Sequence, residues 1–70
     1  MTMRVEYFED TDTLQITFNE RRVADTKDLD ENTLVETDAE GRLVTMTVEH
    51  AHERADLGTF LYRTHRGTAA

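Results

Sequence analysis

Hydrophobic side chains recur at every second position through much of the first 50 residues, which is the period of a β-strand with one buried face. Residues 3–7 alternate apolar and charged side chains, and residues 14–18 repeat the alternation. Residues 9–12, between these two runs, are polar and rich in turn formers. The pattern therefore predicts an antiparallel hairpin.

Three further segments extend this β-pattern. Residues 22–29 are more polar and predict an edge strand or an extended connection, because charged side chains at an edge discourage pairing with another sheet. Residues 33–37 predict a short strand, and residues 42–49 predict a strand with apolar side chains on one side. Gly41 lies between these two strands, where a tight turn needs a positive φ angle.

The pattern changes after residue 49. Residues 50–57 contain helix formers and no β-branched residue, which predicts a helix of about two turns that ends before Gly58. The sequence thus predicts an α+β, β-rich fold, in which an antiparallel sheet of 4–5 strands precedes one short C-terminal helix. We expect one domain over residues 1–70, with a core within residues 3–62 and a flexible end at residues 63–70.

The C-terminal part of the chain contains one apolar cluster, which consists of Phe60, Leu61 and Tyr62. Two interpretations remain open for it. The cluster either covers the open side of the sheet or forms an exposed anchor for a partner, since tyrosine is enriched at interface hot spots.

The size and charge of the chain indicate what it associates with. A domain of 70 residues has a thin core, and a chain without cysteine cannot strengthen that core by disulfides. We therefore expect a homo-oligomer, with a dimer favoured, and a stable monomer is the alternative, since many domains of this size fold alone. The net charge of −7 repels phosphate backbones and argues against nucleic acid as a partner. Because no apolar run has the length of a membrane span or signal peptide, we expect a cytoplasmic protein that does not bind membranes.

Acidic residues are concentrated between residues 25 and 40, where seven carboxylates accompany the single Lys27. This segment predicts either a surface for a basic protein partner or a solvated face that keeps a small protein soluble. The predicted partner-binding residues are Asp25, Asp28, Asp30, Glu31, Phe60, Leu61 and Tyr62.

The residues give no indication of a catalytic site. The chain has no cysteine, no serine and no glycine-rich phosphate loop. Asp12 and Asp38 lie at predicted turns, where aspartate commonly accepts hydrogen bonds from nearby backbone. The sequence thus predicts a protein that is not an enzyme and has no cofactor.

His50 and His52 are the candidate metal ligands. On a strand their imidazoles would share one face, whereas on a helix they would point about 200° apart. A structural zinc ion needs four fixed ligands, so two exposed histidines at a strand-to-helix junction are the favoured interpretation. A small-molecule or metal binder, with a site near these residues at a homodimer interface, is the alternative functional hypothesis.

Three motifs resemble a bacterial family of small proteins, the domain of unknown function 2283 family. After Tyr7, an aspartate begins a strand of the type Asp-Thr-Leu-x-Ile at residues 12–16. The stretch Val-Ala-Asp-Thr follows at residues 23–26, and Asp-Ala-Glu-Gly-Arg-Leu-Val follows at residues 38–44. The chain departs from the family in its closing motif, which lacks the usual glycine and serine.

The resemblance covers about residues 3–51 and implies a fold more than a function. Some members of the family are encoded beside small basic proteins that look like ribonuclease-type toxins. The resemblance therefore implies an antitoxin-like role, in which an acidic module neutralises a basic protein.

Overall fold

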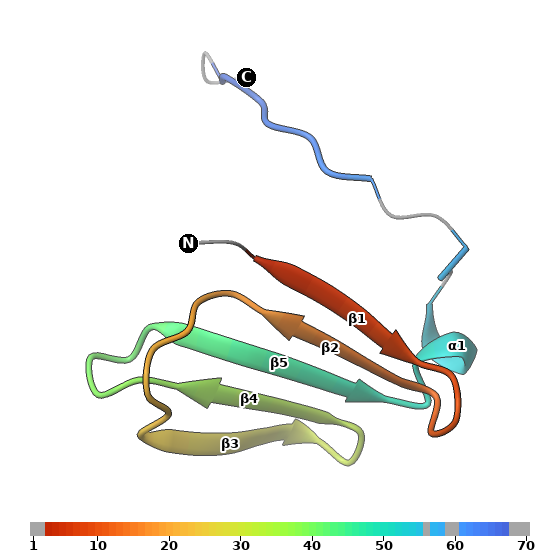
Figure 1. Cartoon of the computed structure of the whole chain (residues 1–70), viewed down its shortest axis with the longest axis horizontal. Coiled ribbons are helices and arrows are strands. Elements are labelled where there is room, and N and C mark those ends of the chain that lie inside the picture. Colours follow the sequence, from red (N-terminus) through yellow and green to blue (C-terminus); the bar gives the residue numbers. More distant parts are fainter. Residues whose placement is uncertain (1–2, 56, 59–60, 68–70) are drawn as a thin grey trace.

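The computed structural model describes residues 3–55, 57–58 and 61–67. Within these residues the chain forms a five-stranded antiparallel sheet followed by one helical turn (Figure 1). The elements are β1 (Arg4–Phe8), β2 (Thr13–Thr17), β3 (Asp25–Asp30), β4 (Thr33–Thr37), β5 (Leu43–Glu49) and α1 (Ala51–Arg54). The prediction of a β-rich α+β fold is confirmed, as is the first hairpin.

The strands lie in the order β1-β2-β5-β4-β3, so β5, the last of the described strands, is the central strand of the sheet. Residues 18–24 connect β2 to β3 by passing the ends of β5 and β4 (Figure 1). The side chain of Asn19 donates a hydrogen bond to the carbonyl of Leu43, and the Ala24 N–H donates to the carbonyl of Thr37. Residues 22–24 belong to this connection, so β3 begins at Asp25 and not at residue 22, where the sequence predicts the start of an edge strand or an extended connection.

The turn before β5 is organised by Asp38. Its Oδ1 atom accepts hydrogen bonds from the N–H groups of Glu40 and Arg42, each at 2.9 Å. Burial opposes ionisation of the Asp38 carboxyl, but these N–H groups and the Arg42 guanidinium outweigh it and lower its pKa. Gly41 has a φ angle of 80°, so the predicted positive φ at this turn is confirmed.

The helix is shorter than the sequence predicts. It ends at Arg54, and Ala55 is extended with a φ angle of −154°, so the prediction that it continues to residue 57 and stops at Gly58 is wrong. His50, which precedes the helix, has a left-handed backbone and provides no side-chain cap. Because an isolated short helix is only marginally stable, these residues form a single turn held by contacts to the sheet.

The sheet has two chemically different faces. One row across four strands, Val5–Ile16–Met46–Val35, is entirely apolar. The next row, Glu6–Gln15–Thr47–Leu34–Asp28, lies on the opposite face and is mostly polar. We call the first side the apolar face; it comprises Val5, Tyr7, Leu14, Ile16, Val35, Val44, Met46 and Val48.

The apolar face is largely uncovered. Val44 is 3% exposed and Val35 is buried, but no large side chain among the described residues is fully buried. The interpretation that the C-terminal cluster covers the sheet is wrong for Leu61 and Tyr62, which are 69% and 72% exposed. Residues 61–67 instead run away from the sheet beyond β1 (Figure 1). Phe60 lies outside the described residues.

Candidate functional site

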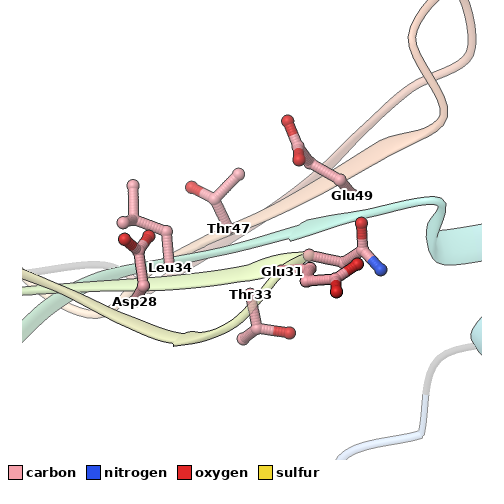
Figure 2. A pocket seen from close by; sticks show the side chains of 7 residues that line it. Asp28, Glu31, Thr33, Leu34, Thr47 and Glu49 are labelled. Atoms are coloured by element: carbon pink, nitrogen blue, oxygen red, sulfur yellow. The ribbon is translucent and has the colours of Figure 1, made fainter.

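A hollow of about 160 Å³ lies where β3, β4 and β5 meet at the β3–β4 turn. Its wall is built by strand register: Asp28 lies opposite Leu34, and Leu34 lies opposite Thr47. Glu49 follows Thr47 on the same face, and Figure 2 shows these four side chains projecting from one side of the sheet. We call this site the acidic hollow; it is lined by Asp28, Glu31, Asn32, Thr33, Leu34, Thr47 and Glu49.

Local backbone contacts hold the turn that closes the acidic hollow. The Asn32 N–H donates to Oδ1 of Asp30 at 2.8 Å, and the Glu49 N–H donates to the carbonyl of Asn32 at 2.7 Å. A register irregularity between Asp28 and Asp30 places Leu29 outside the regular pairing. As a result, Asp28 and Asp30 lie on opposite faces of β3.

The charge of the acidic hollow is not compensated within the described part of the chain. Asp28, Glu31 and Glu49 contribute three carboxylates, and none of them forms an ion pair with a described residue. By contrast, Asp30 pairs with Arg54 at 3.3 Å, and Asp38 pairs with Arg42 at 3.0 Å. A hydrogen bond from the Asn32 N–H, helped by Arg54, lowers the pKa of Asp30. The hollow can therefore receive a cationic group.

The structure brings together only part of the acidic residue set that the sequence predicted. Asp28 and Glu31 line the hollow, whereas Asp25 lies on the opposite face of β3 and Asp30 contacts Arg54. Glu49 was missed by sequence reasoning, because nothing in the local pattern shows that the end of β5 lies beside β4.

The predicted C-terminal anchor does not join the acidic hollow. Residues 61–67 run beyond β1, whereas β3 and β4 lie at the other edge of the sheet (Figure 1). The acidic hollow is lined by residues of β3, β4 and β5, so Leu61 and Tyr62 do not reach it. Both side chains are exposed, which is the state that the anchor interpretation requires. Phe60, the third member of that cluster, lies outside the described residues.

A second cluster forms where the β1–β2 turn meets α1. Asp12, with a positive φ angle of 54°, accepts hydrogen bonds through Oδ1 from the Tyr7 hydroxyl at 2.6 Å and the His52 N–H at 2.9 Å. Its carbonyl accepts a further bond from the Ala51 N–H at 3.0 Å. Asp12 thus connects the first hairpin to the helical turn, although 40 positions separate it from His52.

These contacts shift the titration of both side chains. The Tyr7 hydroxyl donates to a carboxylate, which raises the pKa of Tyr7 to about 12. The same hydrogen bond, together with the His52 N–H, lowers the pKa of Asp12. Asp12 therefore stays ionised at neutral pH and is available as a ligand through its second oxygen.

The cluster has the composition of a partial metal site. Ligand atoms of Asp12, His50 and Glu53 all lie within 4.8 Å of one another, and Nδ1 of His50 lies 3.2 Å from a Glu53 carboxylate oxygen. Three nitrogen and oxygen ligands suit a divalent ion such as Zn²⁺ with water in the remaining position. Of the two predicted histidines, His50 belongs to this cluster, whereas His52 contributes its backbone N–H.

No helix in the described ranges has the length and apolar character needed to cross a membrane. Comparison with known proteins finds no match among curated proteins and none among solved structures.

One family model, described as "Protein of unknown function (DUF2283)", matches residues 4–52. The matched range contains all five strands and the complete acidic hollow, and it excludes Glu53 and the extended C-terminal segment. The family description gives no indication of an enzymatic activity. Because the match spans well over half of the 70 residues, the chain belongs to the DUF2283 family of proteins of unknown function.

Proposed function

We propose that this protein is a non-catalytic interaction module that binds a basic segment of a partner protein at the acidic hollow. The observation that carries the proposal is the set of three carboxylates, Asp28, Glu31 and Glu49, which have no ion-pair partner in the described chain. Asp30, Asp38 and Glu40 are paired with arginine, whereas Glu9, Asp10, Asp25 and Glu36 form no ion pair with a described residue but do not gather around a hollow with three carboxylates.

The chemistry of the hollow suits a lysine or arginine side chain. Leu34 and Thr47 are half-buried between the carboxylates and provide apolar contact for the aliphatic part of such a side chain. The carboxylates then lie beside its charged end. Charge-assisted hydrogen bonds of this kind are stronger than neutral ones, and an arginine can make two of them in parallel.

The surroundings of the hollow favour the same class of partner. The net charge of −7 attracts a basic protein at long range and speeds its association. Within the described sheet β3 is an edge strand, and all six of its residues are exposed. An extended basic segment that reaches the hollow therefore also lies beside backbone groups that can accept a further strand.

The finer form of the proposal is an antitoxin-like role, in which the module neutralises a basic protein by covering its cationic surface. It is supported by the charge of the hollow and by the role that the family resemblance implies. Binding of this kind requires no catalytic group on the module itself.

The proposal is tested with a lysine- and arginine-rich peptide and two variants of equal charge. Asp28→Asn/Glu49→Gln removes two carboxylates from the hollow, while Glu9→Gln/Asp10→Asn removes two from the β1–β2 turn that also form no ion pair with a described residue. Each exposed pair contributes roughly 0.2–1 kcal/mol, so we expect the first variant to weaken binding by about tenfold and the control by much less. Equal weakening by both variants, measured by titration calorimetry at 0.15 M salt, would show that only the net charge matters.

A second candidate function is divalent-cation binding by Asp12, His50 and Glu53, which the closeness of their ligand atoms favours. After treatment with a chelator, added Zn²⁺ should raise the melting temperature, because a ligand at 100 times its Kd stabilises a fold by about 2.7 kcal/mol. His50→Gln should abolish this effect and His52→Gln should retain it. The same Zn²⁺ response in both variants would exclude this cluster as the binding site.

A further inference from the structure

Several large side chains of the apolar face are exposed or only half-buried. Tyr7 and Val5 on β1 are 37% and 38% exposed, and Ile16 and Met46 are only half-buried although β2 and β5 are interior strands. Among the described elements, α1 lies at one end of this face, where Arg54 donates to the hydroxyl of Thr33 at 2.9 Å. The remaining length of the face has no described element packed on it.

The total accessible surface is larger than that of a compact monomer of the same mass. The chain has 5877 Å² of accessible surface, whereas a compact monomer of 8.1 kDa exposes about 4,500 Å². Its radius of gyration is 13.8 Å, against about 11 Å for a compact domain of this length. The extended residues 61–67 account for part of the excess. The exposed and half-buried side chains of the apolar face contribute another part, and a standard protein interface buries about 800 Å² on each partner.

Charge distinguishes the two faces as docking surfaces. On the polar face, the strands carry the carboxylates of Glu6, Asp28, Glu36 and Glu49 against Arg4, which makes a net charge of −3. On the apolar side, the strands carry Asp25, Lys27 and Asp30, which makes a net charge of −1, and Asp30 is paired with Arg54 of α1. Two copies of a chain with charge −7 repel each other in most orientations. Of the two faces of the described sheet, the apolar face brings two copies together with the smaller like-charge repulsion.

We propose that two copies of the chain pack face to face through the apolar face and form a two-layer β-sandwich. Sheets that pack in this way lie about 10 Å apart with their inner side chains interdigitated. A two-fold arrangement is self-complementary, so the central strand of one copy lies over the central strand of the other. Met46, in the middle of β5, is therefore near the centre of the interface, and the acidic hollows remain on the outer surfaces.

The decisive experiment compares neighbouring positions of β5 that point to opposite faces. Sedimentation equilibrium of the full chain at about 100 μM should give twice the 8.1 kDa mass of one chain. Met46→Lys should shift the mass to that of one chain, because two buried ammonium groups would face each other. Thr45→Lys adds the same charge to the polar face and should leave the dimer intact.

A measurement on the unaltered chain guards against a variant that simply unfolds. The melting temperature of an obligate dimer rises with protein concentration, whereas that of a monomer does not change. We expect a rise of several degrees between 5 and 500 μM, and a constant value would overturn the proposal. A single-chain mass at 100 μM, or dissociation caused by Thr45→Lys rather than Met46→Lys, would also overturn it. Because no basic peptide is present, the outcome is independent of the function proposed for the acidic hollow.

Discussion

The two faces of this sheet are made from the same five strands and yet present opposite chemistry. Across the centre, Ile16, Met46 and Val35 form an apolar row, while Gln15, Thr47 and Leu34 occupy the adjacent row on the other side. The polar face needs no cover in a monomer, because polar side chains such as Gln15 and Thr47 can form hydrogen bonds with water. The apolar face is incomplete, because burial of such side chains is the dominant favourable term in folding. The best-buried side chains thus lie on one face of a thin layer, whereas the site proposed for a basic partner lies on the other.

The largest expected effect on stability comes from Val44, the best-buried side chain of the sheet, which lies on the apolar face. Val44→Ala should lower the free energy of unfolding by about 2 kcal/mol, because the side chain is 3% exposed and its loss leaves a cavity. Gln15→Ala on the polar face should change it by less than about 0.5 kcal/mol. Urea denaturation with a constant m-value measures both changes. Similar losses in the two variants would contradict the assignment of the core to one face.

The next effect concerns the turn that sets the register of β5, since a slip by one residue would exchange the two faces. Gly41→Ala should cost about 1 kcal/mol, because the φ angle of 80° disfavours any residue with a Cβ atom. An added Cβ would meet no atom within 4 Å, so the cost is conformational rather than steric. Gly58→Ala serves as a control, and an equal loss in the control would show that the φ angle of Gly41 is not the cause.

A pH titration tests the hydrogen bond between Tyr7 and Asp12 at the edge of the apolar face. The raised pKa of Tyr7, about 12, makes its contribution fully present below pH 10 and lost as the pH rises toward 12. The lowered pKa of Asp12 makes its contribution present above the ordinary aspartate pKa and lost as the pH falls through the folded value.

The variant Tyr7→Phe removes this hydrogen bond while keeping the ring. The difference in stability between the unaltered chain and this variant should therefore be constant between pH 6 and 9 and should shrink at both extremes. Chemical denaturation across the pH range measures this difference. A difference that stays constant up to pH 12 would show that the hydroxyl is not bound to Asp12 in solution.

The smallest effect is expected outside the sheet. Leu61→Ser and Tyr62→Ser should each change the free energy of unfolding by less than about 0.5 kcal/mol, because both side chains are about 70% exposed. Thermal unfolding of the two variants gives this value. A loss of more than 1 kcal/mol would mean that these residues cover the apolar face in solution.

Local pattern predicts the strands well and their arrangement poorly. The alternation through Val44, Met46 and Val48 identifies β5, and Gly41 identifies the turn before it. The position of β5 between β2 and β4 depends on contacts between residues far apart in sequence, such as Leu14 with Val48. Local periodicity contains no information about such pairings.

The candidate sites show the same limit. Asp28 and Glu31 were predicted from the density of acidic residues, which is a local property. Glu49 lies at the acidic hollow because of the β4–β5 register. Asp12 lies close to His50 because the β1–β2 turn and the C-terminal end of β5 are at the same end of the sheet. Both sets of contacts depend on the strand order, which the local sequence pattern does not predict.

The central position of β5 has a consequence for how the chain folds during synthesis. The hairpins β1–β2 and β3–β4 are complete by Thr37, but in the described sheet they touch each other only through β5. A lone two-stranded hairpin is marginally stable in water, so both remain unstable until residues 43–49 emerge from the ribosome. β5 then pairs with both hairpins. A nascent chain that stops before Leu43 lacks the strand that joins the two hairpins of the described sheet, so we expect it to be more sensitive to proteolysis than the chain with all five strands.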